Sequence, residues 1–304
     1  MPEIANLRPI IDLKISALGC VSVMGQSQSR VKEYNQDAYV AFTSYIGDDQ
    51  VHLFAVFDGH GEDGHKVTDY LKSVFPQELE TIAFHYLRGF ASVADVKEGL
   101  KGVFLKVQEE LCAQLGVDTE ASGSTAVVAL MIRDDLFCAN VGDSRAMLGH
   151  KSRPWRVLPL THDHRPESPR EKARITVKRG RIESKYLPNK AAFGPMRVWL
   201  PFRDAPGLAM SRSLGDAEVH EYGVSAEPDI THHKLRSNDR LLLLASDGIW
   251  NFMSNEEAVA LSFRFYDKRA ASRAAESLAA EARRRWRQEG DAVDDITVVT
   301  VFIN

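Results

Sequence analysis

The sequence predicts an α+β fold in which antiparallel β-sheets pack face to face and are covered by helices. Short runs rich in Val, Ile, Leu and Phe, bounded by Asp, Gly and Asn, are grouped along the 304 residues of the chain. Helical patterns come in pairs between these groups, which favours a sandwich over alternating strand–helix units. No internal repeat or low-complexity linker divides the chain, so we expect a single domain over residues 1–304.

The individual elements follow from local patterns. Apolar, β-branched runs predict strands over 37–45, 51–57, 124–132, 136–142, 145–150, 156–160, 240–246 and 296–303. Helical periodicity predicts helices over about 65–90, 93–116, 167–178, 255–264 and 269–288. Ser254 and Glu257 have the spacing of a capping box, which indicates where the fourth of these helices begins.

Composition argues against several classes of protein. The chain is 44% hydrophobic and 26% charged, with a net charge of −4, so we expect a globular protein without general affinity for nucleic acid or membranes. Cys20, Cys112 and Cys138 are few and far apart, which indicates a reducing compartment and no disulfide framework. We expect a monomer in the cytoplasm or nucleus, since no signal peptide, membrane-spanning run or myristoylation signal is visible.

Two apolar runs end in the same dipeptide, Asp58-Gly59 and Asp247-Gly248. Asp-Gly is a common hairpin signal, but a helical pattern rather than a second strand follows each of them. Asp37 stands at the start of one predicted strand, and Asp294 stands just before the last one. If these strands pair antiparallel with the runs that end in Asp-Gly, Asp37 lies near Asp58 and Asp247 lies near Asp294. Two such sheets packed about 10 Å apart would bring all four carboxylates together.

Four clustered carboxylates raise one another's pKa and do not stay ionised unaided. A divalent cation is the simplest remedy. Because the cluster offers oxygen ligands and no nearby Cys or His pair, it favours Mg²⁺ or Mn²⁺ over Zn²⁺. Such centres commonly hold two ions about 3.5–4 Å apart with a water that both activate.

An ordered series of short motifs spans the chain from about residue 16 to 304. It comprises NQDAY (35–39), VFDGHG (56–61), SGSTAVVAL (122–130), ANVGDSRAML (139–148), LTHDHRP (160–166), GLAMSRSLGD (207–216), VSAEPDI (224–230), LLLASDGIW (242–250) and DDITVV (294–299). In this order they resemble the metal-dependent serine/threonine protein phosphatases of type 2C. The resemblance implies a four-layer αββα sandwich, with two central antiparallel sheets flanked by helix pairs. It also implies hydrolysis of phosphoserine and phosphothreonine in protein substrates by a metal-activated water, without a phosphoenzyme.

The same resemblance implies roles for individual positions. Asp58 would bridge two metal ions, and the Gly59 carbonyl would bind one of them. Asp247 and Asp294 would bind the other ion. The remaining implied contacts are those made through water by Asp37 and Gln36, and a weaker third metal bound by Asp143.

His60 is implied to be the general acid for the leaving alkoxide, and Asp216 to order the loops around the site. The family usually has Arg five residues before Asp37, where it binds the substrate phosphate. Here that position is Lys32, with Arg30 two residues earlier, and Lys binds phosphate without the bidentate fork. We expect Lys32 to make this contact.

Two further departures concern the metals. Gln36 stands where the family usually has Glu, so one negative charge is missing on that side of the site. Asp295 stands where the family usually has Asn, which makes the choice of ligand between Asp294 and Asp295 a question of register. The register of the family favours Asp294.

The segment 165–206 is basic, with eleven Lys or Arg against four acidic residues. In the family this region is a flap-like insertion beside the active site, so it could steer phosphorylated substrates; a merely solvated basic face is the other interpretation. The rival for the function as a whole is a catalytically impaired scaffold with a phosphatase fold. The presence of all four cluster carboxylates argues for the enzyme.

Overall fold

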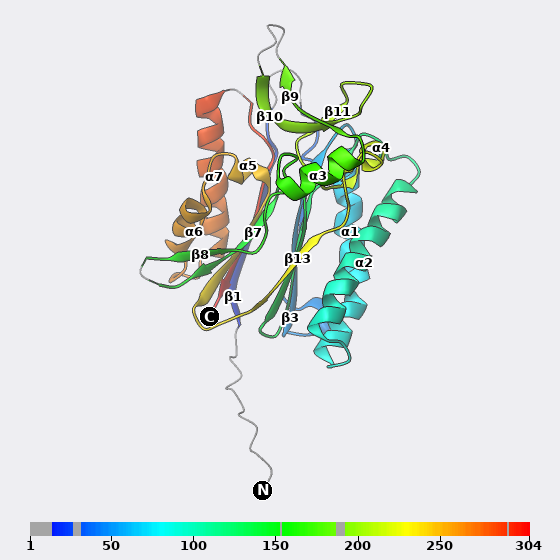
Figure 1. Cartoon of the computed structure of the whole chain (residues 1–304). Coiled ribbons are helices and arrows are strands. Elements are labelled where there is room, and N and C mark those ends of the chain that lie inside the picture. Colours follow the sequence, from blue (N-terminus) through cyan, green and yellow to red (C-terminus); the bar gives the residue numbers. More distant parts are fainter. Residues whose placement is uncertain (1–13, 27–31, 153, 187–191, 291) are drawn as a thin grey trace.

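The chain folds into four layers, as the sequence predicts. The computed structural model describes residues 14–26, 32–152, 154–186, 192–290 and 292–304. Figure 1 shows α1 (Gly64–Leu87) and α2 (Val93–Cys112) on one outer face and α6 (Asn255–Phe263) and α7 (Ala271–Glu289) on the other, with the sheets between them. The expected αββα sandwich is therefore confirmed.

Two antiparallel sheets form the inner layers. The smaller has the order β1-β15-β14-β7-β8 and the larger has the order β12-β4-β3-β5-β6-β13, with β2 added on β3. Their strands are β1 (Ile15–Val23), β2 (Asp37–Phe42), β3 (Val51–His60), β4 (Gly123–Ser124), β5 (Ala126–Ile132), β6 (Asp135–Val141), β7 (Arg145–His150), β8 (Arg156–Pro159), β12 (Leu214–Gly215), β13 (Asp229–Lys234), β14 (Asp239–Ala245) and β15 (Ile296–Ile303).

A third sheet lies at one end of the sandwich and is formed largely by residues of the basic segment. It has the order β11-β10-β9, from β9 (Arg181–Tyr186), β10 (Ala192–Trp199) and β11 (Pro206–Leu208). The helix α3 (Pro169–Val177) packs below it (Figure 1). The short helices are α4 (Ala217–His220), α5 (Asp247–Trp250) and a 3₁₀ turn at Tyr45–Gly47.

The apolar core is divided into three layers, as four packed layers require. One lies between α1, α2 and the larger sheet and includes Phe75 and Phe104. A second lies between the two sheets and includes Phe54 and Leu244. The third lies between the smaller sheet and α6 and α7. Strands such as β15 are buried on both faces, which explains why their sequences show no alternation.

The strands and helices predicted from apolar patterns are present, with ends shifted by a few residues. The capping box at Ser254 and Glu257 is confirmed, since each side chain bonds the other's backbone N–H. Six strands were not predicted, and most of them carry polar side chains or lie at sheet edges: β1, β9, β10, β11, β12 and β13. Across the described residues, every helix is too short or too polar to cross a lipid bilayer.

Candidate metal centre

The strand pairing brings the four predicted carboxylates to one end of the sandwich. Asp37 and Asp58 lie directly opposite each other in the antiparallel pair β2–β3. Asp247 follows β14 and Asp294 precedes β15, and these two strands are also paired antiparallel. The Ser246 hydroxyl donates a hydrogen bond of 2.7 Å to Asp37 Oδ2, which joins the two sheets at this point.

Close packing, rather than turn formation, explains the glycine after each aspartate. Gly59 continues β3, and a Cβ atom there would lie 2.5 Å from the backbone oxygen of Gln36. At Gly248 a Cβ atom would lie 2.1 Å from the backbone oxygen of Asp295. Real Cβ contacts are never this short, so each Asp-Gly pair marks a place where two backbones meet beside a carboxylate.

The carboxylates repel one another in a site with little water. Asp37 is buried and Asp58, Asp247 and Asp294 are half-buried. Burial raises the pKa of Asp58 well above its usual value, and the negative charges of Asp37, Asp247 and Asp294 raise it further. Burial and the charge of Asp294 raise the pKa of Asp247 in the same way. For Asp37, burial outweighs the Ser246 hydrogen bond and raises the pKa to about 7.

The donor set fits a hard divalent cation. Asp37 Oδ1 and Asp143 Oδ1 are buried without a hydrogen-bond partner among the described residues, and carboxylate oxygens in that position are natural cation ligands. In the described parts of the chain no group of three or more His, Cys, Asp or Glu side chains is arranged so that it could hold a metal ion as it stands, so the fit rests on the chemistry of the donors. Gln36 lies beside the cluster, where its Nε2 donates a 2.7 Å hydrogen bond to the Gly61 carbonyl.

Asp294 and Asp295 have different surroundings. Burial raises the pKa of Asp294, while the positive charge of Lys32 opposes this rise. The Asp295 carboxylate is occupied: Oδ1 accepts the Gly25 N–H at 2.6 Å, and Oδ2 accepts the Gln36 N–H at 2.8 Å. Asp295 therefore fixes the backbone on both sides of the chain segment that leads into β2.

Lys32 pairs with the same carboxylate. Its Nζ lies 2.6 Å from Asp295 Oδ2, and the Lys32 side chain is 22% exposed. The contact between Lys32 and the substrate phosphate stays a prediction, and the structure shows that its ammonium group already has a carboxylate partner. Arg30 lies outside the described residues.

His60 is held by Asp216. The His60 Nε2–H donates to Asp216 Oδ2 at 2.7 Å, and Ser213 Oγ donates to the same oxygen at 2.5 Å. Burial lowers the pKa of His60, but the charge and hydrogen bond of Asp216 outweigh this effect and raise it overall. His60 Nδ1 has no partner among the described residues, so one ring nitrogen remains for proton transfer.

Asp143 lies beside the cluster and is paired with an arginine that the sequence analysis did not single out. Arg165 Nη1 lies 3.0 Å from Asp143 Oδ2, and Arg165 Nη2 lies 3.2 Å from Asp163 Oδ2. Burial raises the pKa of Asp143, whereas Arg165 lowers it. In the sequence, Arg165 stands out only as part of the motif LTHDHRP, because its partner Asp143 is distant in the chain.

Five arginines of the basic segment 165–206 have acidic partners. The pairs are Arg165–Asp143, Arg170–Asp229, Arg174–Glu171, Arg181–Asp204 and Arg203–Glu218. Below them the guanidinium of Arg212, 1% exposed, binds Glu171 at 2.7 Å and Asp229 at 2.9 Å. The buried Arg212 thus links Glu171 of α3 to Asp229 of β13.

Comparison with known proteins agrees with this architecture. The family model of protein phosphatase 2C matches residues 21–290. "Probable protein phosphatase 2C 72" of Arabidopsis thaliana is 37% identical over 301 residues, which cover 96% of this chain and 87% of that protein. "Probable protein phosphatase 2C 64" of Oryza sativa subsp. japonica is 35% identical over 283 residues, covering 91% of this chain and 64% of that protein.

A solved structure shows the same fold. The serine-threonine phosphatase 2C from Toxoplasma gondii superimposes with a TM-score of 0.80 and 23% identity, covering 94% of both chains. The sandwich thus matches the type 2C phosphatases in fold, and the chain matches them in sequence. The chain belongs to the protein phosphatase 2C family. It is a metal-dependent protein serine/threonine phosphatase.

The different surroundings of Asp294 and Asp295 predict opposite effects of the same isosteric change. Asp294→Asn should abolish Mn²⁺-dependent turnover and leave stability in EDTA unchanged or higher, because it removes a repelling charge. Asp295→Asn should lower the free energy of unfolding by about 1–3 kcal/mol, because an amide cannot accept both backbone N–H groups and the ammonium. Mn²⁺ titration of activity and thermal unfolding in EDTA measure both effects; the reverse pattern would show that the register at β15 is shifted by one residue.

Proposed function

We propose that the chain hydrolyses phosphoserine and phosphothreonine in proteins by direct attack of a water that two divalent ions, Mg²⁺ or Mn²⁺, activate. One observation carries the proposal: Asp37 and Asp58 face each other across β2–β3, and Ser246 joins them to the strand ends that present Asp247 and Asp294. Among the described residues, the cations that act on this group do so without a printed ion pair to it: Lys32 acts on Asp294, and Arg165 acts on Asp247.

Each residue of the cluster has a part in holding the ions. Asp58 would bridge both, the Gly59 carbonyl would bind one, and Asp247 and Asp294 would bind the other. Asp37 and Gln36 would act through water, and Asp143 would contribute to a weaker third site. When bound, the ions lower the pKa of the attacking water and neutralise charge on the phosphoryl oxygens.

The proton for the leaving group comes from His60. Asp216 holds the ring by its Nε2–H, so that Nδ1 is the atom that gives a proton to the departing serine or threonine oxygen. Asp216, which is fully buried, stabilises the charged imidazolium and fixes its orientation without touching the substrate.

The scaffold alternative requires the loss of carboxylates from the cluster, and Asp37, Asp58, Asp247 and Asp294 are all present. Gln36 stands where the family usually has Glu, and this change removes a negative charge only from the contacts that would be made through water.

All three cysteines are unpaired, which supports a reducing compartment, the cytoplasm or the nucleus.

The metal requirement gives a first test. Hydrolysis of p-nitrophenyl phosphate and of a phosphothreonine peptide should need added Mn²⁺ or Mg²⁺ and stop in EDTA. Asp58→Asn and Asp247→Asn should remove activity, since each deletes an anionic ligand, while Asp267→Asn on the surface should not. Turnover in EDTA near the Mn²⁺ rate would rule out the metal mechanism, and a folded wild type that is inactive with every divalent ion would favour the scaffold.

The role of His60 predicts a dependence on the leaving group. His60→Gln should slow hydrolysis of a phosphoserine peptide by about 100-fold or more, because an alkoxide leaves poorly without a proton. The same variant should affect p-nitrophenyl phosphate much less, since nitrophenolate leaves unprotonated. Steady-state kcat values for the two substrates measure the difference. Equal losses on both would mean that His60 acts in binding or folding instead.

A further inference from the structure

Arg197 belongs to the third sheet, which lies at the end of the sandwich that carries the carboxylate cluster (Figure 1). In Figure 1 the strands β9, β10 and β11 lie over the end of the sandwich where α5 begins, which is the end that carries Asp247. Arg197 of β10 is half-buried there. Burial lowers the pKa of Arg197, and the charge of Asp143 is the one that opposes this effect. Asp143, which lies beside the cluster, is thus the acidic residue whose charge acts on this guanidinium.

The guanidinium of Arg197 has a hydrogen-bond donor without an acceptor among the described residues. Its Nη1 donates to the Gly207 carbonyl at 2.5 Å, and its Nε is buried without a partner among the described residues. No carboxylate in the described part of the chain forms an ion pair with it, although Glu183 is its cross-strand neighbour. A half-buried guanidinium with an unused N–H is costly unless an anion completes its hydrogen bonds.

The other cations near the centre are already engaged. Lys32 Nζ binds Asp295 at 2.6 Å, and Arg165 binds both Asp143 and Asp163. Among these cations of the described residues, Arg197 is the one without a carboxylate partner, and its Nε–H has no hydrogen-bond acceptor. The planar fork of arginine matches two phosphate oxygens, whereas a lysine offers a single point charge.

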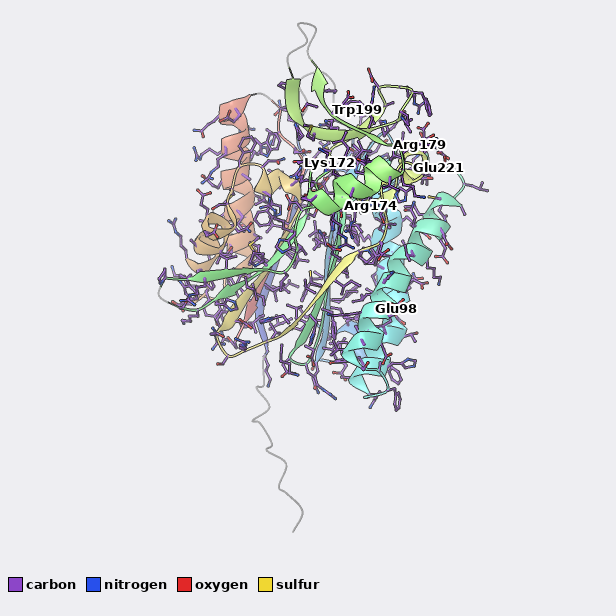
Figure 2. All side chains as sticks on the ribbon, viewed as in Figure 1. Glu98, Lys172, Arg174, Arg179, Trp199 and Glu221 are labelled. Atoms are coloured by element: carbon purple, nitrogen blue, oxygen red, sulfur yellow. The ribbon has the colours of Figure 1, made fainter. Side chains whose placement is uncertain are left out.

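The strand that carries Arg197 is held firmly. Val198 and Leu200 are fully buried in an apolar cluster with Ile175 of α3. Trp199 Nε1 donates to the Glu183 carbonyl at 2.9 Å. Figure 2 shows Trp199 above α3, with Lys172, Arg174 and Arg179 around that helix. Because its strand is fixed, Arg197 loses little conformational entropy when it binds a ligand, and this strengthens the contact.

On the basis of the phosphatase function proposed above, we propose that Arg197 binds the phosphate of the substrate directly and is its principal cationic contact from the protein. Lys32 then acts chiefly through Asp295, by holding the backbone of Gln36. The basic segment thereby contributes to the reaction through one residue rather than through its overall charge.

The experiment compares three charge-removing variants, Arg197→Met, Lys32→Met and Lys185→Met. Lys185 lies on the neighbouring strand β9, is exposed and serves as the matched control. Titration calorimetry of inorganic phosphate into the Mn²⁺-loaded protein reports binding without turnover. We expect Arg197→Met to weaken phosphate about tenfold and Lys185→Met to change it less than about twofold. The KM for a phosphopeptide should rise in parallel, and Arg197→Lys should be intermediate.

Several outcomes would overturn the assignment. Wild-type phosphate affinity in Arg197→Met would do so, as would an equal loss in Lys185→Met, which would indicate a general field, or a larger loss in Lys32→Met. Melting temperatures and Mn²⁺ affinity of each variant identify losses caused by misfolding, and in that case Arg197→Lys decides: unchanged phosphate affinity in this variant refutes the fork. An inactive wild type would contradict the phosphatase function itself, whereas an active wild type with unaffected Arg197 variants contradicts the role of Arg197 alone.

Discussion

Asp37 and Asp58 lie directly opposite each other on the neighbouring strands β2 and β3. The hydrogen bond from Ser246 to Asp37 holds the other sheet, with Asp247 and Asp294 at its strand ends, at the same place. Burial and mutual repulsion raise the pKa of each of these carboxylates. This end of the sandwich therefore opposes folding when all four are ionised. The burial of three apolar layers, which the four-layer fold provides, compensates for this unfavourable free energy.

The cations around the centre form their ion pairs with acidic residues other than Asp37, Asp58, Asp247 and Asp294. Lys32 is bound to Asp295, Arg165 is shared between Asp143 and Asp163, and Arg212 binds Glu171 below the third sheet. These pairs position the loops that surround the cluster and leave its oxygens available for divalent ions. Placed directly on Asp58, the same positive charges would compete with the ions that the family requires.

The parts of the site that could be predicted from the sequence are the aspartates at the ends of predicted strands. An Asp at the end of a strand meets the start of its antiparallel neighbour, so the pairing of Asp37 with Asp58 followed from the sequence. The edge strand β13 and the strand β9 were not predicted, because DITHHK and RIESKY gain stability from pairing and not from apolar burial. The Lys32–Asp295 pair was also missed, since its partners are brought together by the tertiary fold alone.

The most direct test of the repulsion within the carboxylate cluster is the free energy of unfolding of the wild type and of Asp37→Asn, measured in EDTA between pH 4 and 8. The folded protein holds a proton on Asp37 up to a pKa of about 7, whereas the unfolded chain loses it at about 4. The wild type should therefore lose stability relative to Asp37→Asn as pH rises through this window, by up to roughly 4 kcal/mol. Saturating Mn²⁺ should restore the wild type at pH 7.5 and have less effect at pH 5, because protons compete for the ligands. A stability difference that stays constant with pH, with no gain from Mn²⁺, would contradict the account.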